Sequence, residues 1–248
     1  SNETRGTVLS AYMIAQTLGI IGAQGLLTLG DAGTSVLFIG ASILVSVSFA
    51  PILLSVIPAP AAQVAPPMSL PRLFTTSPLG TVGIFLLGSI YATQSGMGAV
   101  FGTQTGMTAS GVALFVAMLF AGALVLQYPI GWLSDRFDRR KLIAAAAMIG
   151  AGFCVLAFLG GGSTVVLLPS AFIAGGVTTP LYALFLAYTN DYLSAEDMPS
   201  ASGGLVFTFG LGAIIGPLAT GVAMERFGPF AFWAVLGGTF GLILLYAL

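Results

Sequence analysis

The residues best suited to ionic chemistry cluster in one short segment, GWLSDRFDRRK, which runs from Gly131 to Lys141. From Asp135 onward, every residue of this segment except Phe137 carries a charge, although only 6% of the whole chain is charged. Carboxylates at such a position can cap helix ends, where unpaired backbone N–H groups favour an anion, and guanidinium groups can form ion pairs. The segment is therefore the first candidate functional site.

The elements that must position this segment are apolar. Hydrophobic residues make up 57% of the chain, and apolar runs of about 20 residues, the length that a helix needs to cross a bilayer, recur along it. The runs lack a period-2 alternation, which favours helices over a closed barrel. The sequence predicts an all-α, polytopic membrane helix bundle of eight transmembrane helices in the lipid bilayer. These spans are 6–29, 34–57, 79–101, 108–131, 142–160, 163–189, 199–223 and 229–248.

The composition argues against several other classes of protein. The chain has no histidine, the commonest metal ligand and proton shuttle, and its single cysteine, Cys154, lies in an apolar run. No cluster of acids, bases or metal ligands falls at membrane depth, so we expect neither an enzyme nor a bound metal or cofactor. The net charge of −1 is too small to suggest a nucleic-acid partner.

A proline-rich stretch divides the chain into unequal parts. The prolines of residues 58–78 cannot continue a helix and favour an extended connector. We interpret residues 1–57 as the last two helices of a first bundle, 58–78 as a cytoplasmic linker, and 79–248 as a six-helix second bundle.

The distribution of Lys and Arg predicts the orientation. With a cytoplasmic N-terminus, the inner loops collect all of these cations except Arg226, which agrees with the positive-inside rule. Both ends of the chain are then cytoplasmic. The inner cations are Arg5, Arg72, Arg136, Arg139, Arg140 and Lys141.

The charged segment resembles the GxLxDRxGRR signature of the major facilitator superfamily, with Asp138 in place of the second Gly of that pattern. The resemblance rests on Gly131, Leu133, Asp135, Arg136, Arg139 and Arg140, with Arg5–Gly6, YPIG before the segment and PLYALFLAYTNDYL after it. These residues are similar to those of the bacterial inner-membrane permeases, which have twelve helices. The resemblance implies a partial major facilitator fold that begins at helix five. We therefore expect a truncated permease whose helices one to four are missing.

The resemblance also implies a cytoplasmic gate. Asp135 would cap the start of the first span, around residues 4–7, across the interface between the bundles, and Gly131 would let helices approach there. Arg136, Arg139 and Arg140 are expected to pair with Asp191 after the sixth span. For Arg140 and Lys141, a plain positive-inside anchor is the alternative.

Polar residues suggest where a solute binds. In the family, the third and sixth spans of this chain would line the central cavity, and each carries polar residues at helical spacing. The cavity candidates are Tyr91, Gln94 and Ser95 on the third span, and Thr178, Tyr182 and Thr189 on the sixth. The alternative is that these residues join helices by hydrogen bonds. Close helix packing is assigned to Gly19, Gly22, Gly212, Gly216 and Pro217, in the similar strings LGIIGAQG and GAIIGPLA.

The middle of each span contains no charged residue, the usual marker of an ion pathway. Either the coupling residues lie in the missing helices or the protein is a facilitator, and the solute is expected to be neutral or amphipathic. The sequence thus predicts a secondary active or facilitative transporter of a small organic solute, which works by alternating access in the inner membrane. The alternative is a non-transporting membrane scaffold or a degenerate transporter fragment.

Overall fold

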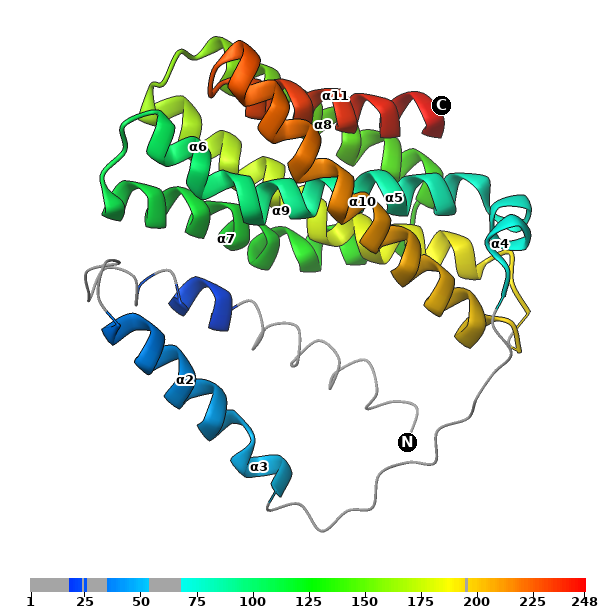
Figure 1. The fold of residues 1–248 in the computed structure, drawn as a ribbon. Helices are drawn as coiled ribbons and strands as arrows, with labels where there is room; N and C mark the ends of the chain where they lie inside the picture. Colours follow the sequence, from blue (N-terminus) through cyan, green and yellow to red (C-terminus); the bar gives the residue numbers. More distant parts are fainter. Residues whose placement is uncertain (1–17, 24, 26–34, 54–67, 195) are drawn as a thin grey trace.

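The computed structural model describes residues 18–23, 25, 35–53, 68–194 and 196–248. The first predicted span therefore lies mostly outside the described residues, as does the linker up to residue 67. The second span contains α2 (Val36–Ser48) and the short α3 (Ala50–Leu53). None of the residues of α2 is buried, and Figure 1 shows α2 and α3 to one side of the other helices.

The remaining helices form one bundle (Figure 1). A continuous span is built from α5 (Pro78–Ala92), the π-helix η1 (Thr93–Met97) and α6 (Gly98–Gln104). It is followed by α7 (Ala109–Ser134), α8 (Arg139–Leu159), α9 (Thr164–Asn190), α10 (Met198–Phe227) and α11 (Ala231–Ala247). In the described part of the chain, five helices are long and apolar enough to cross a membrane, and α2 and α11 are shorter apolar helices. The fold is all-α and polytopic, as predicted.

Local sequence explains where these helices begin and end. Proline occupies the first turn of α5 and α10, where its missing N–H would have no partner within the helix. The Thr108 hydroxyl accepts a hydrogen bond from the Gly111 N–H and caps α7. Gly228 ends α10 with a φ of 85°, a left-handed backbone conformation that favours glycine.

Helices pack in pairs through glycines. The main contacts join α5 to α10, α7 to α9, and α8 to α11. A Cβ at Gly212 of α10 would overlap the Phe85 carbonyl of α5, and a Cβ at Gly122 of α7 would overlap the Phe172 carbonyl of α9. Bare glycine surfaces therefore bring these backbones together, which is how membrane helices gain contact area without a hydrophobic driving force.

An aromatic cluster closes the end of the bundle at which α6 meets α7 and α11. The Phe101 ring is fully buried and stacks on Phe232 with 5.1 Å between ring centroids. Phe115, Phe230 and Trp233 pack against the same ring at 5.4 to 6.0 Å. Edge-to-face and stacked pairs of this kind favour one arrangement of the three helices at this end.

A short helix precedes the bundle. Helix α4 (Leu70–Thr76) lies in the segment that the sequence assigns to the linker. Its Leu73 is fully buried, Met68 just before it is 7% exposed, and both lie against the first turns of α10 near Gly204. In Figure 1, α4 accordingly sits at the end of the bundle where α5 and α10 begin.

Candidate functional site

The charged segment forms a tight turn between α7 and α8. Asp138 has a φ of −56° and a ψ of 118°, an ordinary extended conformation that needs no glycine. Its carboxylate accepts hydrogen bonds from the backbone N–H groups of Arg140, at 2.8 Å, and Lys141, at 3.3 Å. Asp138 is therefore the N-cap of α8. This role explains how an aspartate can stand where the family pattern has glycine, and the sequence analysis missed it.

The arginines of the segment have different partners. Arg139 forms an ion pair with Asp191, the C-cap residue of α9. The Arg140 Nε donates to the Ala247 carbonyl at the end of α11, at 2.7 Å, where a cation complements the helix dipole. The Arg136 guanidinium lies 3.7 Å from the centre of the Trp132 ring, one turn earlier. Of the three arginines, only Arg139 contacts Asp191.

Asp135 and Gly131 have no such contacts among the described residues. Asp135 is exposed at the C-cap of α7, and its carboxylate accepts no hydrogen bond from any described residue. A Cβ at Gly131 would meet no described atom within 4 Å, so the expected close approach is not made there. The Leu133 carbonyl accepts from the Arg136 and Phe137 N–H groups and closes the end of α7. The expected partner of Asp135, residues 4–7, lies outside the described residues.

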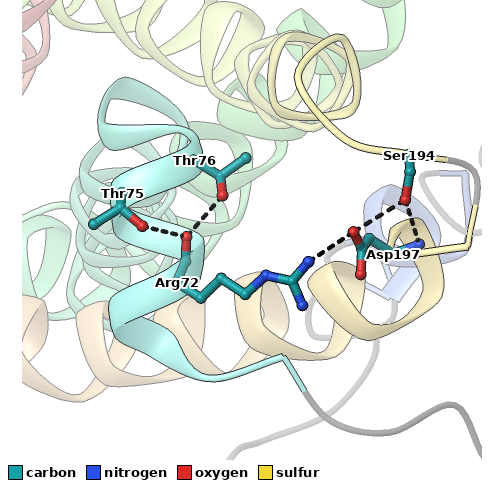
Figure 2. Close-up of polar contacts among 5 residues, drawn as sticks. All are labelled: Arg72, Thr75, Thr76, Ser194 and Asp197. Atoms are coloured by element: carbon teal, nitrogen blue, oxygen red, sulfur yellow. Dashed lines mark hydrogen bonds and ion pairs between the residues drawn. The ribbon is translucent and has the colours of Figure 1, made fainter.

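A second ion pair joins α4 to the start of α10 (Figure 2). The Arg72 Nη2 of α4 donates to the Asp197 Oδ2 at 3.0 Å, and the Ser194 hydroxyl donates to the same oxygen, also at 3.0 Å. Asp197 is the N-cap residue of α10. The loop between α9 and α10 therefore contacts an arginine at each end, since Arg139 pairs with Asp191. No sequence pattern linked Arg72 to Asp197, because they are 125 residues apart.

The cavity candidates of the third span lie in different surroundings, at and beside the π-helix η1. Gln94 is 5% exposed and its side-chain Nε2 has no hydrogen-bond partner among the described residues, whereas Tyr91 is half-buried and Ser95 is exposed. Regular α-helical spacing predicted one shared face. Gln94 instead faces into the bundle, and the next residue, Ser95, faces out of it.

The candidates of the sixth span are divided in a similar way. Thr178 and Thr189 are buried, and their hydroxyls donate to the Ala174 and Phe185 carbonyls of their own helix, each at 2.8 Å. Thr189 also lies against Gly80 of α5 and accepts from the Ser77 hydroxyl at 3.4 Å. Thr189 thus joins the end of α9 to the start of α5, whereas the Thr178 hydroxyl bonds within α9. Tyr182 is half-buried, whereas both threonines are buried.

Phe209 of α10 brings the two candidate tyrosines together. Its ring centroid lies 5.8 Å from that of Tyr91 on α5 and 5.7 Å from that of Tyr182 on α9, the second pair edge-to-face. Neither phenol hydroxyl makes a hydrogen bond to a described residue. The sequence analysis did not single out Phe209, since phenylalanine is common throughout this chain. We refer to Tyr91, Phe209 and Tyr182 as the aromatic trio.

The predicted packing residues fall into two groups. Gly212 and Gly216 of α10 lie against α5, where a Cβ would overlap the Phe85 and Ser89 carbonyls. Pro217 follows in the interior of α10. Gly19 and Gly22 have no described atom within 4 Å of a built Cβ, so they make no close packing with the described residues.

Comparison with known proteins supports a transporter fold. Residues 79–248 match the profile of the Major Facilitator Superfamily. An uncharacterised MFS-type transporter of Yersinia pestis is 25% identical over 240 residues, which are 94% of this chain and 61% of that protein. Another, from Bacillus subtilis, is 29% identical over 146 residues, which are 58% of this chain and 36% of that protein. This chain thus spans less than two thirds of the length of these relatives.

A solved structure shares the fold. The fucose:proton symporter of E. coli superposes with a TM-score of 0.61 at 18% sequence identity, over 85% of this chain and 53% of that chain. At this level of identity the likeness concerns the arrangement of helices, and the residues that contact a solute must be judged from this chain itself.

Proposed function

Because this chain belongs to the major facilitator superfamily, we propose that it forms part of a secondary transporter that moves a small organic solute by alternating access. The observation that carries the proposal is the aromatic trio, which the last turn of α5, the second half of α9 and the first half of α10 present together. A multi-pass membrane protein of this family is built around a solute pathway between two bundles, and the described six-helix bundle supplies one wall.

The chemistry of the trio favours a neutral or amphipathic solute. Two phenol hydroxyls without partners in the described structure are costly at membrane depth unless water or a ligand satisfies them. This cost supports a hydrated or ligand-filled pathway beside the trio. The middle parts of the described membrane-length helices contain no Asp, Glu, Lys or Arg to balance a charged solute. Ring stacking together with hydroxyl donors would suit an uncharged molecule that carries a ring and a hydrogen-bond acceptor.

The charged segment would form the gate. Arg139 and Asp191 join the start of α8 to the end of α9, and Asp135 remains exposed at the adjacent helix end. In the proposed mechanism, Asp135 caps the start of the first span when the cytoplasmic side is closed and loses that contact when it opens. We place the protein in the bacterial inner membrane with both ends of this chain in the cytoplasm, as the distribution of Lys and Arg favours.

A ligand-stabilisation and transport screen of uncharged, ring-bearing solutes on the complete transporter tests this function. We expect a solute that raises the thermal unfolding temperature of the detergent-solubilised protein and is taken up by proteoliposomes. For such a solute, Tyr182→Phe should weaken binding about 2- to 13-fold, because one neutral hydrogen bond contributes roughly 0.5–1.5 kcal/mol. Gln94→Ala should also weaken binding if the unpartnered amide turns toward the solute.

Thr178→Val is the matched control, since the Thr178 hydroxyl is buried and bonded to its own helix. It should leave solute affinity within about twofold. Equal loss of folded protein in Tyr182→Phe and Thr178→Val would assign Tyr182 to helix packing. A complete protein that inserts and folds but moves no solute would favour the scaffold alternative.

A further inference from the structure

The segment before the bundle carries a single charged residue, and this residue makes a specific contact. Arg72 is the only charged residue between positions 58 and 78. Its guanidinium forms an ion pair with Asp197, which lies 125 residues later in the chain. Its helix also inserts the fully buried Leu73 beside Gly204 of α10. A Cβ at Gly204 would lie 3.0 Å from the Leu73 Cδ2, so the glycine leaves the space that Leu73 occupies.

The local structure of α4 holds Arg72 in place for this contact (Figure 2). The Arg72 carbonyl accepts hydrogen bonds from the Thr75 hydroxyl at 2.9 Å and the Thr76 hydroxyl at 2.8 Å. Both hydroxyls belong to the last turn of α4 and bond back to a carbonyl of their own helix, which adds side-chain hydrogen bonds to a short element. The backbone at Arg72 is therefore well supported although α4 has only seven residues.

Asp197 is used in an unusual way for a residue at a helix start. It occupies the N-cap position of α10, yet its side chain makes no capping hydrogen bond there. One carboxylate oxygen instead accepts from both Arg72 and Ser194. The first two residues of α10 offer no free N–H, because the Met198 N–H donates to the Ser194 carbonyl and Pro199 has none. The Asp197 carboxylate therefore serves the contact with α4 and with the loop before α10.

We propose that Arg72 and Asp197 form a clamp that docks α4 on the start of α10 and positions the α9–α10 loop, which carries Asp191. The part of the chain that moves as one unit in the proposed transport then begins at Met68. The α9–α10 loop is held at Asp191 by Arg139 and at Asp197 by Arg72. Release of α4 leaves the Asp197 carboxylate with the Ser194 hydroxyl as its donor. Arg72 is thus a positioning residue, and its removal loosens α4 and the loop without unfolding the bundle.

Distance measurement across the clamp tests this proposal in the complete protein. Cys154→Ser removes the only cysteine of this chain, and spin labels are then placed at Phe74 on α4 and at Glu196 beside Asp197, both exposed. We expect one narrow distance population in the otherwise unchanged protein. Arg72→Ala should raise the fraction of longer distances about two- to fivefold, the effect of losing one exposed ion pair.

One further variant, one salt condition and one control separate the clamp from a general loss of charge. The double exchange Arg72→Asp with Asp197→Arg should restore the narrow population, and 1 M salt should broaden it in the unexchanged protein because exposed pairs are screened. Arg226→Ala, at the other end of α10, should change nothing. An unaltered distribution in Arg72→Ala, or a double exchange that restores nothing, would overturn the proposal. The distances do not depend on solute transport, so a failed transport assay leaves this result standing.

Discussion

At the residue scale, Asp138 shows how one side chain sets the geometry of the charged segment. Its carboxylate caps α8 through the Arg140 and Lys141 N–H groups, and its φ lies in the range open to any residue. We expect Asp138→Ala to lower the free energy of unfolding by about 0.5–2 kcal/mol, because two N–H groups lose their acceptor. Thermal or denaturant unfolding in detergent measures this. Asp138→Asn and Asp138→Gly should cost only a few tenths of a kcal/mol. A loss in Asp138→Gly as large as in Asp138→Ala would contradict the capping role.

At the element scale, the α5–α10 pair depends on glycines that permit backbone contact. A methyl group at Gly212 would overlap the Phe85 carbonyl, whereas one at Gly210 of the same helix would meet no described atom within 4 Å. We expect Gly212→Ala to destabilise the bundle by roughly 1–3 kcal/mol through overpacking. Gly210→Ala is the matched control and should be neutral or stabilising by up to about 1 kcal/mol, because Ala favours a helix over Gly. Equal unfolding temperatures for the two variants would show that α5 and α10 separate readily.

At the scale of the whole molecule, the helix order predicts which positions share a side of the membrane. Phe74 precedes the α5–α6 span and Phe137 follows α7, so two crossings separate them, whereas Phe227 ends α10 after three further spans. Cysteines at these exposed sites, in a Cys154→Ser background, should react with a membrane-impermeant maleimide from two sides. Phe74→Cys and Phe137→Cys should label from the cytoplasm and Phe227→Cys from the opposite side. Labelling of Phe74→Cys and Phe137→Cys from different sides would contradict the topology.

The fold class could be predicted from the sequence, because apolar runs of membrane length have few alternatives to a helix in lipid. The described membrane-length helices coincide with five of the predicted spans, and the spacing of the charged segment identified the family. Local patterns involve only a few neighbouring residues, so they do not predict contacts between distant segments. The boundaries 58–78 and 79–248 and the gate and cavity roles stay predictions.

Which distant residues meet follows from how the helices pack. Phe209 stands between Tyr91 and Tyr182 because α5, α9 and α10 converge, and Arg72 reaches Asp197 because α4 folds back onto α10. The packing also buries Gln94 and leaves the adjacent Ser95 exposed. Contacts between remote segments depend on how helix surfaces fit together, and in a chain with so few charges that fit depends on glycine and ring shapes spread along the sequence.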